Sequence, residues 1–197
     1  MRIVGGDLGG RVLRAPAGAA TRPTSEKVRE AIFGILNRLE IALHRRGPVR
    51  RGSAMEGARV LDLFAGSGAL GIEALSRGAV HATFVDFGKA PLGVIRGNLK
   101  ELGLEARATV LGSDAVAAAA RPVAPPFDFV FIDPPYASNL ATRASLALPL
   151  ESLAPEATII IEHDRRHAPP ETLGSLVRID ERRYGDTLVS FYQRGPT

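Results

Sequence analysis

From residue 59 onward, the chain alternates between segments with the pattern of buried β-strands and segments with the pattern of α-helices. We expect strands over residues 59–64, 82–86, 108–111, 127–132, 158–162, 176–183 and 187–193, and helices over residues 69–77, 90–102, 115–120 and 140–148. Strands that alternate with helices predict a parallel sheet covered by helices on both faces. The last two strands are joined at Gly185 and Asp186, which predicts an antiparallel hairpin. The fold expected is therefore α/β and Rossmann-like, with a mostly parallel seven-stranded sheet and a C-terminal antiparallel hairpin.

The residues before position 59 are expected to extend this sheet domain, so that the whole chain forms a single structural domain. Residues 1–23 contain two short extended pieces around glycines and then a Pro/Ala/Gly-rich linker, which predicts a hairpin-like arm. Within residues 24–58, a helix is expected to begin at Thr24 or Ser25, either of which can cap it. The polar, breaker-rich residues 44–58 predict a mobile basic loop. Residues 59–197 form the sheet domain.

Positive charge is concentrated at the N-terminal end of the chain. Residues 1–59 carry twelve Lys or Arg against five Asp or Glu, whereas residues 60–197 carry thirteen against sixteen. Of the 25 basic residues 22 are arginine, the side chain best suited to bidentate contact with phosphate. This distribution indicates an arm that binds a polyanion such as RNA, although an arginine-rich genome would give the same composition. The candidate phosphate contacts are Arg11, Arg14, Arg22, Lys27 and Arg29. The alternative for each is an ordinary solvated side chain, and a second alternative for Arg29 is a role at the active site from the helix.

Several classes of protein are excluded by residues that the chain lacks. It has no cysteine, which excludes disulfide scaffolds, thiolate metal sites and cysteine nucleophiles. No apolar run approaches the roughly 20 residues of a membrane span, and no apolar segment typical of a secretory signal follows Met1. His163 and His167 have the i, i+4 spacing of metal ligands, but they follow a strand and lack an evident third ligand, so no metal is expected. We therefore expect a cytoplasmic protein with no membrane partner.

A glycine motif indicates a cofactor site. Residues 60–71 (VLDLFAGSGALG) combine a buried strand, a G-x-G-x-x-G turn and the start of a helix. Gly66 and Gly68 let a ligand approach the backbone closely, and the helix N-terminus favours an anionic group. Asp86 ends the second strand, where its carboxylate can accept hydrogen bonds from ribose hydroxyls. The motif predicts a nucleoside-containing cofactor; the alternative is a purely structural turn.

Asp62 distinguishes between cofactors that share this motif. It lies four residues before Gly66, at the end of the strand. There its carboxylate can bind the ammonium of a methionyl group, whereas it would repel the pyrophosphate of a dinucleotide. We therefore expect S-adenosylmethionine, with S-adenosylhomocysteine as the product. The alternative is a carboxylate that only caps the following turn.

A second motif, Asp133-Pro134-Pro135-Tyr136, directly follows the apolar strand 127–132. Open α/β sheets bind ligands at this end of their strands. The exocyclic amine of a nucleobase is a poor nucleophile, because its lone pair is delocalised into the ring. Two acceptors, the Asp133 carboxylate and the Pro134 carbonyl, can turn that lone pair toward a methyl donor, and the two prolines fix the carbonyl. Tyr136 offers a face for an extruded base to stack on. The alternative is a strand-ending turn with an aromatic plug.

Together, these motifs resemble those of amino-group methyltransferases that act on nucleic acids. The N-terminal residues narrow the resemblance to the RsmD family of 16S ribosomal RNA guanine-N2 methyltransferases, and it spans nearly the whole chain. Its most specific part is Arg22-Pro-Thr24 together with Arg29-Glu30. The segments that carry the resemblance are residues 2–6, 10–13 with Pro16, 21–24, 28–33 and 62–77.

The resemblance implies a guanine of 16S rRNA within small-subunit particles as acceptor and residues 59–197 as the methyltransferase domain. It implies further donor contacts at Phe64, Asp114 and Ala115, the alternative for Asp114 being a helix N-cap. The family usually has Glu at position 86, so the shorter Asp86 leaves the donor affinity open. We expect a monomer.

Three other functions remain open from the sequence. The Asp-Pro-Pro-Tyr tetrad permits adenine-N6 methylation of DNA or RNA equally well, since no residue distinguishes the two bases. An NAD(P)-dependent oxidoreductase would share the glycine motif, but the chain lacks an evident acid or base for hydride transfer. A non-catalytic RNA-binding module would keep the fold and bind rRNA without turnover.

Overall fold

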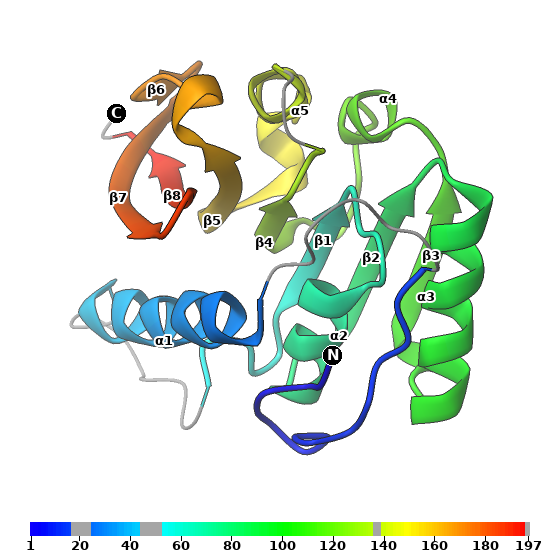
Figure 1. Ribbon diagram of the computed structural model, residues 1–197. Coiled ribbons are helices and arrows are strands. Elements are labelled where there is room, and N and C mark those ends of the chain that lie inside the picture. Colours follow the sequence, from blue (N-terminus) through cyan, green and yellow to red (C-terminus); the bar gives the residue numbers. More distant parts are fainter. Residues whose placement is uncertain (17–24, 44–52, 136–138, 196–197) are drawn as a thin grey trace.

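Strand β1 (Arg59–Leu63) lies inside an eight-stranded sheet in the computed structural model, which describes residues 1–16, 25–43, 53–135 and 139–195 (Figure 1). The strand order is β3-β2-β1-β4-β5-β8-β7-β6, so the order reverses between β1 and β4. Ligands bind at such a switch point in open α/β sheets. The parallel strands are β1, β2 (His81–Asp86), β3 (Ala108–Gly112), β4 (Phe127–Ile132) and β5 (Leu153–Asp164). The antiparallel strands are β6 (Thr172–Leu173), β7 (Leu176–Tyr184) and β8 (Thr187–Arg194).

The expected α/β class, parallel order and C-terminal hairpin are confirmed, but the expected number of strands is wrong by one. The additional strand is β6, which pairs only two residues with β7 at the edge of the sheet. Two residues are too few to show the period-2 pattern that identifies a strand. The edge strand therefore depends on its neighbour and not on its own sequence.

Helices cover both faces of the sheet (Figure 1). On one face lie α1 (Glu26–Leu43), α2 (Ala69–Ser76) and α3 (Lys89–Leu102), and on the other α4 (Ala115–Ala119) and α5 (Leu140–Ala147). Alternate residues of β4 point to opposite faces, so Phe131 joins the core beneath α1 and α2 whereas Ile132 joins the core beneath α4 and α5. This explains why the last four residues of β4, Phe129 to Ile132, are all apolar. Short 3₁₀ turns are η2 (Glu105–Arg107), η3 (Leu150–Ser152) and η4 (Arg165–His167).

The N-terminal arm, described over residues 1–16, is built into the domain. Arg2 and Val12 pair in one antiparallel bridge, which agrees with the expected hairpin-like arrangement. Ile3 and Leu13 are 1% and 2% exposed and belong to the core on the side of α1 to α3. In Figure 1 the arm runs along α2 and reaches α3. The arm is therefore a packed part of the fold as well as a carrier of basic side chains.

Part of the expected mobile loop 44–58 is ordered by the helix before it. The backbone N–H of Ala54 donates to Oδ1 of Asn37 in α1 (2.8 Å), and Met55 and Ala58 are fully buried. The expectation is wrong for residues 53–58, because this turn fills the space between α1 and β1. The basic residues at 45, 46, 50 and 51 lie outside the described residues.

Candidate active site

The loops that follow β1, β2, β3 and β4 meet at the C-terminal ends of these parallel strands, which we call the ligand edge. In the register of the parallel strands, Leu63 of β1 lies beside both Val85 of β2 and Ile132 of β4, and Asp86 lies beside Gly112 of β3. The glycine motif, Asp86 and the Asp133 segment therefore come together, as expected from the sequence. The ligand edge, at the C-terminal ends of β1 to β4, is the candidate active site.

The glycine loop, defined here as residues 64–68, has an unusual backbone. Gly66 and Gly68 have φ of 56° and 78°, and Phe64 has φ of 61°, a conformation that costs a non-glycine residue about 1–3 kcal/mol. Gly68 precedes α2, so the loop delivers the N-terminus of that helix to the site. Such strained positions persist where the surrounding structure fixes them, and they are typical of ligand-binding loops.

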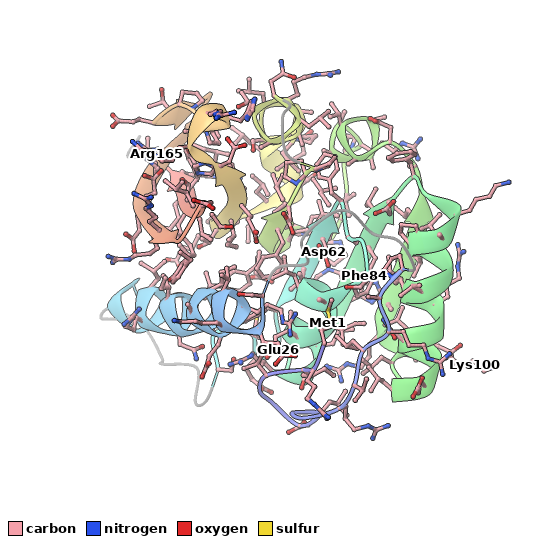
Figure 2. All side chains as sticks on the ribbon, viewed as in Figure 1. Met1, Glu26, Asp62, Phe84, Lys100 and Arg165 are labelled. Carbon is pink, nitrogen blue, oxygen red and sulfur yellow. The ribbon has the colours of Figure 1, made fainter. Side chains whose placement is uncertain are left out.

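Gly71 explains why the motif needs a third glycine inside α2. A Cβ atom at Gly71 would lie 2.3 Å from Cε1 of Phe84 and 3.1 Å from Oδ2 of Asp62. Asp62 and Phe84 lie close together where α2 packs on the sheet (Figure 2). Only glycine allows the helix to approach β1 and β2 this closely. The third glycine therefore serves packing and keeps the helix N-terminus at the edge of the sheet.

Asp62 is buried close to the ligand edge, and its pKa is raised. Its side chain is 2% exposed, and its Oδ2 accepts a hydrogen bond from the backbone N–H of Gly71 (2.9 Å). Burial raises the pKa of Asp62 from 3.8 to about 7; the Gly71 hydrogen bond opposes this rise and the nearby charge of Asp86 adds to it. The turn-capping contact considered from the sequence is therefore present. A buried carboxylate with a raised pKa is also one that a cationic ligand would stabilise.

Asp86 links two loops of the site. Its Oδ2 accepts a hydrogen bond from the N–H of Gly66 (3.0 Å), and its Oδ1 accepts one from the N–H of Gly88 (2.8 Å). A carboxylate has about four acceptor positions, so these bonds leave room for ribose hydroxyls as further donors. The neighbouring Phe87 is 79% exposed. Phe87 is not among the site residues predicted from the sequence, although an aromatic residue directly after a strand-ending carboxylate is a signal of a ligand-binding position.

Asp114 adopts the alternative role considered for it. Its Oδ1 accepts a hydrogen bond from the N–H of Ala117 (2.9 Å) and caps α4, and Ala115 is buried. Both residues follow β3 at the edge where the glycine loop lies. A contact of Asp114 or Ala115 with a cofactor stays a prediction.

The Asp133 segment follows β4 next to the glycine loop. The backbone N–H of Asp133 donates to the carbonyl of Leu63 (3.5 Å), the residue before Phe64. Pro134 is buried and Pro135 is exposed, so the tetrad passes from the sheet toward solvent at this point. Tyr136 lies outside the described residues. The structure therefore brings the first three residues of the tetrad to the candidate cofactor site.

The candidate phosphate contacts do not form one group. Arg11 and Lys27 are exposed, and Arg14 is 70% exposed and pairs with Glu101 of α3 (2.9 Å). Arg22 lies outside the described residues. Arg29 is fully buried, so its expected role as a phosphate contact is wrong.

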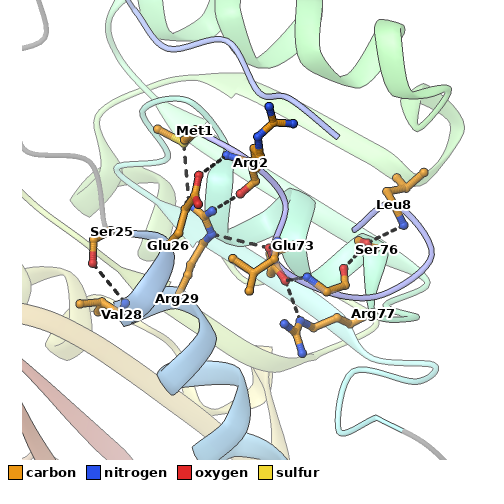
Figure 3. Close-up of polar contacts among 12 residues, drawn as sticks. Met1, Arg2, Leu8, Ser25, Glu26, Val28, Arg29, Glu73, Ser76 and Arg77 are labelled. Carbon is orange, nitrogen blue, oxygen red and sulfur yellow. Dashed lines mark hydrogen bonds and ion pairs between the residues drawn. The ribbon is translucent and has the colours of Figure 1, made fainter. Parts of the chain in front are cut away.

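Arg29 belongs to a buried cluster that fixes the N-terminal arm (Figure 3). Its Nε lies 3.6 Å from Oε2 of Glu73 in α2, and its guanidinium donates to the carbonyl of Arg2. Glu73 also accepts hydrogen bonds from the N–H groups of Val4 and Gly5 (2.8 Å each). Burial lowers the pKa of Arg29, and the charge of Glu73 opposes this effect. One feature of the sequence indicated this burial: Arg29 lies four residues before the buried Phe33, so the two residues share a helix face.

The two histidines with metal-ligand spacing have other contacts. Nε2 of His163 lies 2.8 Å from Oγ of Ser190, and Nδ1 of His167 lies 2.9 Å from Oδ1 of Asp164. Within the described part of the chain, no group of three His, Cys, Asp or Glu side chains is placed to hold a metal ion. None of the described helices has the length and apolar character needed to cross a membrane.

Comparisons with known proteins agree with this arrangement. A family model described as conserved hypothetical protein 95 matches residues 1–193. The chain is 40% identical over 199 residues to the putative rRNA methyltransferase YlbH of Bacillus subtilis, covering 98% of this chain and 99% of that protein. It is 34% identical over 195 residues to ribosomal RNA small subunit methyltransferase D of Escherichia coli, covering 98% and 90%.

Solved structures of similar chains have the same fold as this chain. The putative methyltransferase YhhF from Escherichia coli superposes with a TM-score of 0.79 at 32% identity, covering 100% of this chain and 99% of that one. The putative methylase HI0767 from Haemophilus influenzae superposes with a TM-score of 0.76 at 29% identity, covering 100% and 99%. The similarity therefore includes the N-terminal arm as well as the sheet.

Proposed function

Because the chain belongs to the RsmD family of methyltransferases, described as conserved hypothetical protein 95, and has the class I methyltransferase fold, we propose that it methylates the N2 amine of a guanine in 16S rRNA. The proposed donor is S-adenosylmethionine and the proposed product S-adenosylhomocysteine. One observation carries the proposal: the Asp133 segment lies directly beside the glycine loop, through the contact of Asp133 N–H with the Leu63 carbonyl. An amine held by the first would therefore face a donor held by the second.

The residues at the candidate site fit S-adenosylmethionine. The buried Asp62 carboxylate, with its pKa raised to about 7, would gain a cationic partner in the donor's ammonium group. The left-handed glycines at 66 and 68 let the backbone approach the donor, and Asp86 offers acceptors to the ribose. Phe87 offers an exposed aromatic face for the adenine. When bound, the donor supplies an electrophilic methyl group on a sulfonium.

The acceptor amine is positioned by Asp133 and Pro134. The Asp133 carboxylate and the Pro134 carbonyl accept hydrogen bonds from the two N–H groups of the amine. These bonds direct the nitrogen lone pair toward the methyl carbon. With the donor bound, a nitrogen–carbon bond would form as the donor's carbon–sulfur bond breaks, S-adenosylhomocysteine would be released, and one proton would leave the nitrogen for Asp133 or water. Pro135 restricts the backbone of Pro134, so this acceptor is fixed before the base arrives.

The proposed RNA partner is recognised first through its phosphates. Arg11, Arg14 and Lys27 are exposed on the arm and on the first turn of α1, and Arg22 lies between them in the sequence. A target guanine would have to be unstacked or flipped, because its N2 cannot be reached inside a duplex. The named activity of the Escherichia coli relative supports small-subunit rRNA as the substrate. We propose that the enzyme acts as a monomer on partly assembled small subunits in the cytoplasm.

The test is to identify the modified nucleoside. Purified protein is incubated with labelled S-adenosylmethionine and either deproteinised 16S rRNA or partly assembled small subunits, and the RNA is digested for mass analysis. The expected product is N2-methylguanosine, formed in larger amount on the particles. Formation of N6-methyladenosine would contradict the proposed acceptor. Binding of a nicotinamide cofactor without a labelled product would contradict the proposed reaction.

A further inference from the structure

We propose that Asn98 is a positioning residue through which the N-terminal arm holds the glycine loop in its donor-binding conformation. The inference rests on the proposed function, because it assumes that the glycine loop binds the methyl donor. It adds a role for the arm that is separate from RNA binding. The arm would support the glycine loop through its own backbone, which Asn98 binds, while its arginine side chains are exposed to solvent.

Asn98 bridges two segments that are far apart in the sequence. It lies on the inner face of α3 and is 2% exposed. Its Oδ1 accepts a hydrogen bond from the N–H of Arg14 (3.0 Å), and its Nδ2 donates to the carbonyl of Arg14 (3.1 Å). The same Nδ2 donates to the carbonyl of Ser67 in the glycine loop (3.1 Å). One buried amide therefore binds the end of the arm on one side and the donor loop on the other.

Another contact of Ser67 also joins it to the arm. Its hydroxyl donates to Sδ of Met1 (3.6 Å), and Nη1 of Arg29 donates to the same sulfur (3.7 Å). Ser67 is 9% exposed, and this contact directs its hydroxyl toward Met1 of the arm. The neighbours of Ser67 in the loop are held differently: the N–H of Gly66 donates to Asp86 and the N–H of Gly68 donates to the carbonyl of Ala65. The middle of the loop is thus supported from the arm.

The arm is fixed at both ends, which makes it a usable support. Near its start, Glu73 of α2 accepts hydrogen bonds from Val4 and Gly5, and at its end Asn98 binds both backbone groups of Arg14. Between them, the bridge of Arg2 with Val12 ties the two extended pieces together. A change at Asn98 would release the end of the arm and the Ser67 carbonyl together. The three left-handed residues of the loop would then lose one of the restraints that keep them in place.

The test replaces the amide donor by an acceptor of the same shape. In Asn98→Asp, the acceptor for the Arg14 N–H is kept, but a carboxylate oxygen faces the carbonyls of Arg14 and Ser67. We expect the Kd of S-adenosylmethionine, measured by calorimetry, to rise at least tenfold. The KM for the donor should rise by a similar factor, whereas kcat at saturating donor should stay within about threefold of the wild type. This split is the mark of a positioning role, because a misfolded fraction would lower kcat and leave KM unchanged.

Two control variants of α3 separate positioning from general destabilisation. Leu99→Ala removes a buried neighbour of Asn98 that is 2% exposed and packs in the core; it should lower the melting temperature with little change in the donor KM. Lys100→Ala changes an exposed residue of the same helix and should alter neither quantity. If Asn98→Asp does not fold, Asn98→Ser, which keeps one donor, should raise the donor Kd by a smaller factor.

The outcomes distinguish the inference from the proposed function. Wild-type protein that does not bind S-adenosylmethionine contradicts the proposed function itself. Wild-type protein that binds the donor, together with an Asn98→Asp Kd within twofold of it, overturns the inference and leaves the proposed function standing. An equal rise in donor KM in Leu99→Ala overturns it as well, because the effect would then follow stability alone.

Discussion

Asp62→Asn is expected to stabilise the protein in the absence of ligand and to do so increasingly as the pH rises. Burial raises the pKa of Asp62 to about 7, so the folded protein holds this proton to a higher pH than the unfolded chain, in which the pKa is 3.8. Between these values the folded state binds more protons, and its stability falls as the pH rises. One pH unit corresponds to about 1.4 kcal/mol. Because the slope flattens near the folded pKa, the free energy of unfolding should therefore lose about 2 kcal/mol between pH 5 and pH 7 through this one group.

The asparagine side chain removes this pH dependence. Its carbonyl can still accept the hydrogen bond from the N–H of Gly71, and it carries no charge to desolvate. Urea unfolding of both proteins at pH 5, 6, 7 and 8 would measure the effect, with the exposed Asp7→Asn as control. The stability difference between Asp62→Asn and the wild type should grow by about 2 kcal/mol from pH 5 to pH 7 and then level off. A difference that is constant with pH, or that shrinks, would show that Asp62 does not hold its proton in the folded protein.

Three further predictions concern the arm, the buried cluster and α2. Replacing Arg11 and Arg14 by Gln together should weaken RNA binding and reduce the slope of log affinity against log salt by about 2; an unchanged slope in filter-binding titrations would contradict a phosphate role for these side chains. Arg29→Met should lower the free energy of unfolding by about 3–5 kcal/mol, because it leaves a buried carboxylate of α2 without this partner; a loss below about 1 kcal/mol in urea unfolding would show that the pair is not buried in solution. Gly71→Ala should cost about 1–3 kcal/mol, because its Cβ would lie 2.3 Å from Cε1 of Phe84; a thermal unfolding midpoint equal to that of the wild type would contradict the close packing of α2.

The elements that the sequence predicts well are those whose burial is complete and local. The sequence predicts β4 over 127–132 and the strand is found there, because a short run rich in aromatic and β-branched residues between turn residues favours a buried strand over a helix. β5 was expected over 158–162 but extends over Leu153–Asp164. Its first residues include Pro155 and the exposed Glu156, which do not have the pattern of a buried strand. Their pairing depends on the neighbouring strand.

The site was predictable where spacing along the chain fixes position and was missed where distant segments meet. The glycine motif, Asp86 and Asp133 each end a parallel strand, so their proximity follows from the topology. The burial of Arg29 depends on Glu73, 44 residues later in the chain, and an arginine in a basic segment otherwise indicates an exposed side chain. Asn98 gave no signal, because its partners lie 84 and 31 residues away.

We propose that Asp133 and Pro134 activate an amine beside a bound donor, and a single-turnover measurement on Asp133→Ala tests this activation. The rate of methyl transfer to the RNA is measured with saturating donor, and donor affinity is measured separately by calorimetry. We expect a fall in rate of about 10²–10³-fold or more, with the Kd of S-adenosylmethionine within about threefold of the wild type. A variant that transfers methyl groups at a near-normal rate would contradict the proposed activation.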